Sequence, residues 1–170
     1  MVVDARQLRV LKAEIQSDLR AIRRLDEAVA EAVPTDPEKE PPKVVRSGLA
    51  LYLHHFYEAV EHIFLRVARA LDHFQPAGEA WHRDLLEAAA LEIEGIRPPI
   101  ISETTRVELE RYRSFRHIVR HAYEREFLWK SMKDLVADYP EVSRLVRADV
   151  ETFLAVLDRM IRQLESDDEA

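Results

Sequence analysis

The amino-acid sequence predicts an all-α fold, an antiparallel bundle of four to five helices. Only three glycines occur in 170 residues, and the alternating runs typical of strands are scarce. Alanine, leucine, glutamate and arginine dominate instead, and these residues favour helices. Apolar residues recur at spacings of three and four, and prolines mark the breaks between these stretches. This pattern is typical of long helices joined by short connections.

Two long helices are expected in the first half of the chain. Apolar residues recur from Leu8 to Val29 and predict a helix over residues 4–33. The segment "PTDPEKEPPK" ends it, because proline lacks the backbone N–H that a helix interior needs. A second helix is expected over residues 44–73, up to the break at "FQPAGEA".

Two further helices are expected in the middle of the chain. The third begins at residue 78 or 79 and ends near residue 94, before the glycine and two prolines of "GIRPPIIS". The fourth is expected over residues 104–125. The hydroxyl of Ser102 is placed to cap it, because serine accepts a hydrogen bond from the first turn of a helix.

The C-terminal part is expected to hold a short helix around residues 128–137 and then a long one. Pro140 suits the first turn of the last helix, where the missing N–H has no partner in any case. We therefore expect the last helix to run from this proline to about residue 165. The acidic segment 166–170 is expected to fray.

Length, composition and charge narrow the class of protein. A chain of 170 residues can bury a core of its own, and it has no internal repeat. We expect one domain over residues 1–170, with its core at about 4–165. The absence of cysteine excludes disulfides, thiolate catalysis and cysteine-ligated metal sites. The net charge of −7 argues against broad non-specific binding to DNA.

We expect a cytoplasmic protein without membrane contact. No apolar run approaches the roughly 20 residues that a membrane span needs. The N-terminal segment "MVVDARQLRVLKAEI" has neither the charged-then-apolar order nor the cleavage site of a signal peptide.

The fourth expected helix gathers cationic side chains in an otherwise acidic chain. Residues 106–130 carry seven arginine and lysine side chains against four glutamates. Arg113, Arg116 and Arg120 follow the spacing i, i+3, i+7, so they share one stripe of a helix. In one interpretation, these arginines pair with nearby glutamates and the histidines beside them pack at helix contacts. In the other, the stretch binds phosphate.

The histidine pair His117 and His121 raises the question of a metal site, because residues four apart share a helix face. However, "HIVRH" lacks the glutamate of the H-E-x-x-H zinc motif. A site with two histidines also needs a third ligand, which the sequence does not identify. We therefore expect no metal here.

Phosphodiester cleavage fits these residue types better. A guanidinium neutralises the charge that develops on the nonbridging phosphate oxygens, and an imidazole transfers the protons. Such a site needs no metal and no other cofactor. Arg116 and His121 lie five residues apart, so they point about 140° apart around one helix. Two copies related by a two-fold axis would bring them together, which predicts a homodimer.

The segment "RHIVRHAY", from Arg116 to Tyr123, has the form R-x4-H-x-Y. It resembles the signature of the HEPN superfamily, and in particular that of HepT-like ribonuclease toxins of prokaryotic toxin–antitoxin systems. The segment "LHHFYEAVEHIF" resembles the second helix of these proteins, which carries an aromatic residue and a glutamate near Tyr57 and Glu61. "EAWHRDLLEAA" and "RPPIISETTRVELERYRSFRHIVRHAYE" resemble their third and fourth helices. The resemblance covers roughly residues 45–160.

This resemblance implies a HEPN-like bundle that acts as a dimeric, metal-independent endoribonuclease with a composite site at the subunit interface. Arg116 and His121 match the catalytic pair. Tyr123 matches the tyrosine that an MNT-type nucleotidyltransferase antitoxin modifies with AMP. The added anion would compete with the RNA phosphate for the arginines. The partners implied are therefore RNA, the antitoxin and a second copy of the chain.

Four residues are expected to support the catalytic pair: His117, Arg120, Tyr57 and Glu61. His117 follows the motif arginine, where the family usually has a polar residue. Tyr57 and Glu61 either reach the cationic helix through a hydrogen bond or pair with each other at the surface. His82, at the start of the third expected helix, either packs there or contributes to the site.

Two other functions compete with the ribonuclease. Some HEPN proteins keep the fold and lose the activity, so the chain could be a noncatalytic module that binds nucleotide or a partner protein. It could also be a structural helical protein whose arginine stripe pairs across an interface.

Overall fold

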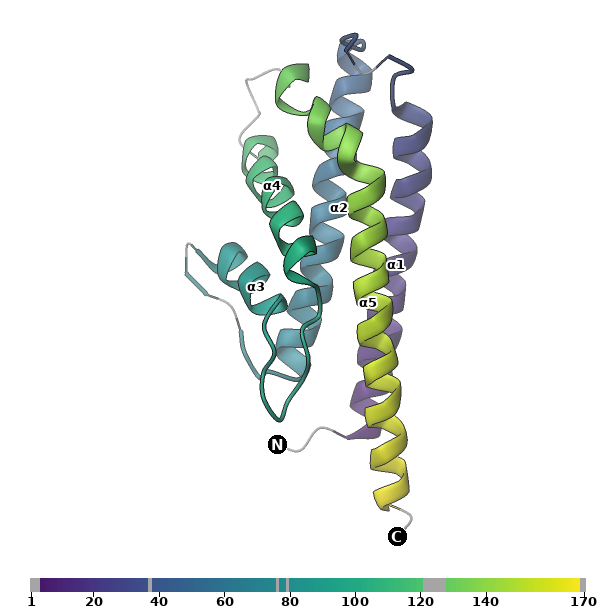
Figure 1. The fold of residues 1–170 in the computed structure, drawn as a ribbon, viewed down its shortest axis with the longest axis vertical. Helices are drawn as coiled ribbons and strands as arrows, with labels where there is room; N and C mark the ends of the chain where they lie inside the picture. The colour runs from purple at the N-terminus through teal and green to yellow at the C-terminus, as the bar shows by residue number, and fades with distance from the viewer. Residues whose placement is uncertain (1–3, 37, 76, 79, 121–127, 169–170) are drawn as a thin grey trace.

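In the described part of the chain, three long helices form the body of the molecule, and two shorter ones pack along one side of it (Figure 1). The computed structural model describes residues 4–36, 38–75, 77–78, 80–120 and 128–168. The helices of this part of the chain are, in order, α1 (Ala5–Ala32), α2 (Lys43–Ala70), α3 (Trp81–Ala89), α4 (Glu103–Arg120), the 3-10 turn η2 (Trp129–Ser131) and α5 (Lys133–Asp168). Helices α1 and α4 run in one direction, and α2 and α5 run in the other (Figure 1). The prediction of an all-α antiparallel bundle is confirmed.

Helix α2 occupies the centre of the bundle, where α1, α3, α4 and α5 all contact it. Its buried side chains lie on several faces, and Phe56, Val60 and Phe64 are among the least exposed. Helix α1 instead buries one stripe from Leu8 to Val29, as its periodicity predicts. The central position of α2 places any polar side chain on its inner faces in contact with other helices.

Hydrogen bonds with side chains cap the N-terminal ends of α1 and α4. Asp4 and Gln7 form a reciprocal capping box at the start of α1. At the start of α4, the Ser102 hydroxyl accepts a hydrogen bond from the Thr105 backbone N–H, so the expected cap is confirmed. Asp149 of α5 accepts hydrogen bonds from the backbone N–H and hydroxyl of Ser102 and from the hydroxyl of Thr105. The N-terminal end of α4 is thereby attached to α5.

Helix α3 is shorter than the sequence indicated, because it begins at Trp81 and ends at Ala89. The expected range of 78 or 79 to 94 was too long at both ends. Gly78 has a φ of 93°, outside helical values, and Gly95 turns the chain with a φ of 74°. Beyond the end of α3, the guanidinium of Arg97 donates hydrogen bonds to the carbonyl oxygens of Ala88 and Leu91, which a longer helix would have used for its own backbone hydrogen bonds.

The expected start of the last helix at Pro140 is wrong, and so is the separate short helix at 128–137. A 3-10 turn occupies residues 129–131, and α5 runs from Lys133 through Pro140. Tyr139 and Ser143, on either side of the proline, both donate hydrogen bonds to Asp26 of α1, which keeps the helix against the bundle. Proline in a helix interior bends it. The first turns of α5 tilt away from the rest of the helix (Figure 1).

Other boundaries agree more closely. Helix α2 ends at Ala70, three residues before the expected His73, and His73 has a positive φ of 50°. The described part of α4 ends at Arg120, and residues 121–125 of the expected helix lie outside the described residues. In the part of the chain that the structure covers, no helix is long and apolar enough to cross a membrane.

Arg97 connects the segment after α3 to the end of α2 through five hydrogen bonds. Its Nε and Nη2 bind the two carboxylate oxygens of Asp72 at 2.8 and 2.9 Å. Nη1 donates to the carbonyl oxygens of Leu91 and Pro98, and Nη2 donates to that of Ala88. Arg97 is only 4% exposed, and all five N–H donors of its guanidinium are used.

Arg97→Ala is expected to lower the free energy of unfolding by about 3–5 kcal/mol, because it leaves Asp72 as a buried charge without its partner. Arg97→Lys is expected to recover little, since an ammonium cannot form the two-pronged bond to the carboxylate. Urea denaturation followed by circular dichroism measures both. Arg144→Ala, which removes an exposed pair with Glu141, is the control and should leave the midpoint unchanged. A fully stable Arg97→Lys protein would contradict this account.

Candidate functional site

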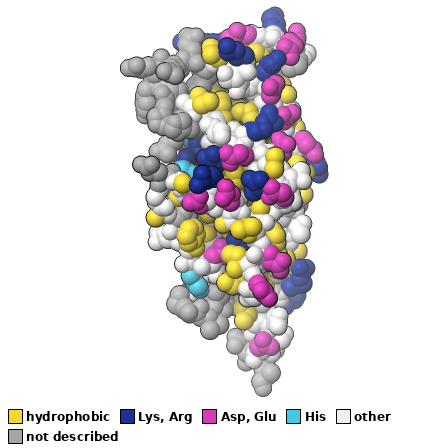
Figure 2. Space-filling model, turned by 60° about the vertical axis from the view of Figure 1, so that its left-hand side comes forward, with side chains coloured by type: hydrophobic (Ala, Val, Ile, Leu, Met, Phe, Trp, Pro, Cys, Tyr) yellow, Lys and Arg dark blue, Asp and Glu magenta, His cyan; other side chains and the backbone are white. Residues whose placement is uncertain are grey.

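Most described arginines of α4 are paired with glutamates of the same helix. Arg106 binds Glu103 and Arg111 binds Glu108, each three residues earlier, and Arg111 also binds Asp138 of α5. Cationic and acidic side chains lie next to one another across the middle of the face in Figure 2. The first interpretation of the cationic stretch therefore holds for these arginines.

Arg113 of the expected phosphate-binding stripe is also neutralised. Its Nε and Nη2 donate to the two carboxylate oxygens of Glu110 at 2.9 and 2.5 Å. The hydrogen bonds from Arg113 hold the pKa of Glu110 below its usual range. The positive charge of Arg113 is thus compensated by a glutamate of its own helix.

Arg116 differs, because its partners come from two other helices. Its Nη1 lies 3.0 Å from Nε2 of His82 on α3, and its Nη2 lies 3.7 Å from a carboxylate oxygen of Glu61 on α2. The Arg116 side chain is 12% exposed and that of Glu61 is 5% exposed. Among the described arginines of α4, this is the one anchored at the junction of α2, α3 and α4.

His82 and Glu61 are themselves in direct contact. Nδ1 of His82 lies 2.5 Å from the other carboxylate oxygen of Glu61. Trp81 packs on the same imidazole, with a distance of 3.5 Å between ring centroids. Glu61, His82 and Arg116 therefore form one connected group, which we call the Glu61–His82–Arg116 cluster. Its members lie 21 and 34 residues apart in the sequence, on three helices.

Tyr57 lies one turn before Glu61 on α2 and is 1% exposed. Burial and the neighbouring Glu61 carboxylate raise the pKa of its hydroxyl, and the opposing influence of Arg113 and Arg116 is smaller. Because both Tyr57 and Glu61 are buried, they do not form the surface pair that the sequence left open. Tyr57 is a neutral phenol beside the cluster at physiological pH.

Two more tyrosines are buried, Tyr112 on α4 and Tyr139 on α5. Tyr112 donates a hydrogen bond to the carbonyl oxygen of Leu135, and Tyr139 donates one to Asp26. Both pack edge-on against Phe56. Burial raises the pKa of each hydroxyl, and for Tyr139 the Asp26 carboxylate raises it further.

These raised pKa values predict a loss of stability in alkaline solution. Tyrosines of the unfolded chain ionise near pH 10, whereas Tyr57, Tyr112 and Tyr139 stay protonated in the folded protein. Their contribution is fully present below about pH 10. Above it, the unfolded state binds fewer protons, so the free energy of unfolding falls by about 1.4 kcal/mol per pH unit for each buried tyrosine.

Urea denaturation at several values between about pH 9 and pH 11.5 measures this slope. Tyr57→Phe is expected to remove one of the three contributions and make the slope correspondingly shallower. Equal slopes for the wild type and Tyr57→Phe would contradict the assignment.

Four expected site residues lie wholly or partly outside the described part of the chain. His121 and Tyr123 lie outside the described residues, as does any contact that they make. His117 and Arg120 belong to the last turn of α4, and only their backbone is described. The convergence of Arg116 with His121 therefore remains a prediction, as do the supporting roles of His117 and Arg120. Within the described ranges, no group of three or more histidine, aspartate or glutamate side chains could hold a metal ion.

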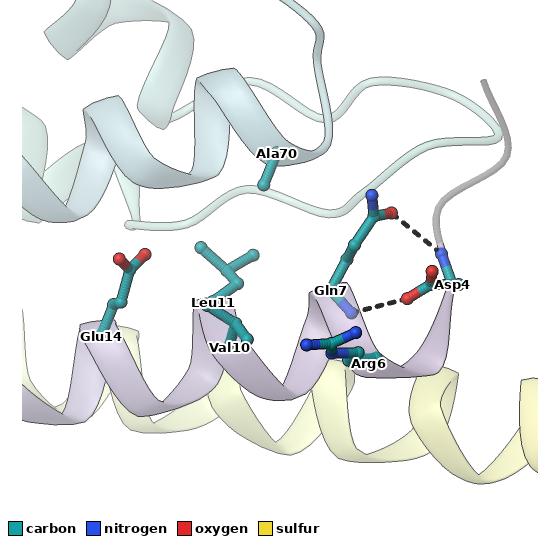
Figure 3. Close-up of a pocket in the computed structure, with 7 residues that line it drawn as sticks. All are labelled: Asp4, Arg6, Gln7, Val10, Leu11, Glu14 and Ala70. Atoms are coloured by element: carbon teal, nitrogen blue, oxygen red, sulfur yellow. Dashed lines mark hydrogen bonds between the residues drawn. The ribbon is translucent and has the colours of Figure 1, made fainter.

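The hollow drawn in Figure 3 lies away from the cluster. The hollow in Figure 3, of about 340 Å³, lies between the first turns of α1 and the end of α2, and Asp4, Gln7 and Ala70 are among its lining residues. The dashed lines show that Asp4 and Gln7 are engaged in capping α1 (Figure 3). None of the three cluster residues lines this hollow.

Comparison with known proteins identifies the family. A family model described as HepT-like protein matches residues 48–157, which include most of α2, all of α3 and of the described α4, and much of α5. All three residues of the cluster and the whole R-x4-H-x-Y segment fall in the matched range. Searches of the curated proteins and of the solved structures found no match.

Proposed function

The chain belongs to the HepT-like family of the HEPN superfamily, and from this we propose that it is a metal-independent endoribonuclease toxin. The single observation that best supports the proposal is the position of Arg116. The motif arginine is held by α2 and α3, whereas Arg113, one turn earlier, is neutralised within α4, and Arg111 pairs with Glu108 and with Asp138 of α5 away from this junction. An arginine held by other helices is pre-oriented, and pre-orientation is what charge stabilisation in a transition state requires.

In this proposal Arg116 binds the scissile phosphate and His121 transfers the proton. In the described contacts, Nη1 of Arg116 forms a hydrogen bond with His82, and Nη2 forms an ion pair with Glu61. Its Nε is buried and has no hydrogen-bond partner among the described residues, so it does not face a substrate. A guanidinium has five donors, so the N–H groups of Nη1 and Nη2 that do not face His82 or Glu61 remain for the nonbridging oxygens of a phosphodiester. A second subunit would supply the converging Arg116 and His121 across a two-fold axis.

The proposed regulator is an MNT-type nucleotidyltransferase antitoxin that transfers AMP to Tyr123. Burial narrows the possible acceptors among the five tyrosines of the chain. Tyr57, Tyr112 and Tyr139 are each about 1% exposed and are thus inaccessible to a second enzyme. Tyr52, half-buried on α2, and Tyr123 are the other two. AMP on Tyr123 would place a phosphate close in sequence to Arg116 and compete with RNA.

Purified protein is expected to cleave RNA in the presence of a chelator. Arg116→Ala and His121→Ala are each expected to lower the cleavage rate at least about 100-fold, because one removes charge stabilisation and the other removes proton transfer. Arg106→Ala is the matched control, since it removes an arginine of the same helix that pairs with Glu103 away from the cluster. Gel-based cleavage assays measure the rates, and circular dichroism and size-exclusion chromatography report fold and dimer.

Arg116→Lys serves where Arg116→Ala fails to fold, because it keeps the positive charge and loses the two-pronged donor geometry. Chelator-sensitive cleavage, or full activity in both the Arg116 and His121 variants, would refute the proposal. Tight RNA or nucleotide binding without turnover would instead favour the noncatalytic HEPN module.

Co-expression with a nucleotidyltransferase encoded beside the gene is expected to add one or more AMP units to the protein. Intact-mass measurement detects the gain, and peptide mapping is expected to place it on Tyr123. Tyr123→Phe should abolish the gain, whereas Tyr52→Phe should leave it unchanged. Modification that persists in Tyr123→Phe would exclude this regulatory site.

A further inference from the structure

His82 lies between a carboxylate and a guanidinium, and it contacts each through a different ring nitrogen. Nδ1 faces Glu61 at 2.5 Å, and Nε2 faces Nη1 of Arg116 at 3.0 Å. The side chain is 17% exposed, so solvent has limited access to it. Both ring nitrogens therefore have a charged partner on a different helix.

The identity of these partners determines the tautomer of the imidazole. A guanidinium has donors and no acceptor, so Nε2 of His82 must accept the hydrogen bond from Arg116. Nε2 can accept only when it carries no proton. The single proton of the neutral ring is then on Nδ1, from which it is donated to the carboxylate of Glu61.

Protonation of His82 would disrupt this arrangement. With a neutral ring, the charges of Glu61 and Arg116 cancel within the cluster. A second proton would occupy Nε2, remove the acceptor for Arg116 and place two adjacent cations against one carboxylate. In a largely buried cluster the extra positive charge is costly. Arg116 would consequently lose its partner on α3.

We propose that His82, held in the Nδ1–H tautomer by Glu61, positions the Arg116 guanidinium and releases it when the ring takes up a proton. His82 is thus a pH-sensitive positioning residue. Its effect on RNA cleavage rests on the proposed function, whereas the hydrogen-bond arrangement can be tested without any activity.

Among the described residues, α2 and α4 contribute the charged and titratable groups in contact with His82 or one turn from its contacts, and Arg83, Asp84 and Glu87 follow it on α3. Helix α2 contributes Glu61 and, one turn away, Tyr57, which stays neutral because burial and Glu61 raise its pKa. Helix α4 contributes Arg116, with the Arg113–Glu110 pair one turn earlier. On α3 itself, the uncharged Trp81 packs on the ring.

Nitrogen NMR of the ¹⁵N-histidine-labelled full-length protein reads the tautomer directly. At about pH 7.5, His82 is expected to show a protonated Nδ1 and an unprotonated Nε2. Exposed His62, on the same central helix as Glu61, is the control. Arg116→Gln is expected to shift the Nε2 resonance of His82 and leave that of His62 unchanged.

Two substitutions of His82 separate positioning from packing. His82→Gln places an amide oxygen near the former Nε2, so it can still accept from Arg116, and it does not titrate. His82→Asn is too short to reach Arg116. The Asn variant is expected to lose about 10- to 100-fold in kcat for RNA cleavage, the usual size of such supporting effects. The Gln variant should stay within about threefold of the wild type and lose the part of the acid-side decline that His82 causes.

The outcomes distinguish this inference from the proposed function. RNA cleavage by a wild-type protein whose His82 carries its proton on Nε2 would overturn the positioning role alone. Equal losses in His82→Gln and His82→Asn, with both proteins folded, would do the same. The expected tautomer in a protein that cleaves no RNA would overturn the ribonuclease proposal, and the effect of His82 on RNA cleavage with it.

Discussion

The carboxylate of Glu61 is buried where α2, α3 and α4 meet, and the arrangement of these helices depends on how its charge is compensated. An isolated buried carboxylate is strongly unfavourable, and it becomes tolerable when paired and hydrogen-bonded. His82 and Arg116 provide this compensation, one from each neighbouring helix. The contacts that compensate the buried Glu61 charge therefore also orient the motif arginine, Arg116. A bundle without Glu61 would have no electrostatic reason to hold Arg116 in this position.

Periodicity predicted the long helices well because their burial is repetitive. Leu8 to Val29 lie on one stripe, and the chain after them breaks at the prolines of residues 34–42. The predicted start of the last helix at Pro140 was wrong because the local preference of proline favours a helix start. The hydrogen bonds of Tyr139 and Ser143 that hold this part of α5 end on Asp26, more than a hundred residues earlier in the chain. Such tertiary contacts override local preference and leave no periodic signal in the sequence.

The site could be predicted only in part, for the same reason. The R-x4-H-x-Y spacing indicated Arg116, and the pattern of α2 indicated Glu61, because both belong to local motifs. The cationic stripe was overestimated, since counting charges does not show that Arg113 binds Glu110 through two hydrogen bonds. His82 stayed undecided because its role depends on two residues of other helices. The spacing of residues within one segment does not predict contacts among residues of three different helices.

The hydrogen bonds of Arg97 have a consequence for how this sequence can drift during evolution. Three of the five end on main-chain carbonyls, at positions 88, 91 and 98, and two end on the side chain of Asp72. Carbonyl acceptors are common to all residue types. The side chains at those three positions are therefore free to diverge while the path of the chain is preserved, whereas Asp72 and Arg97 must be inherited as a pair.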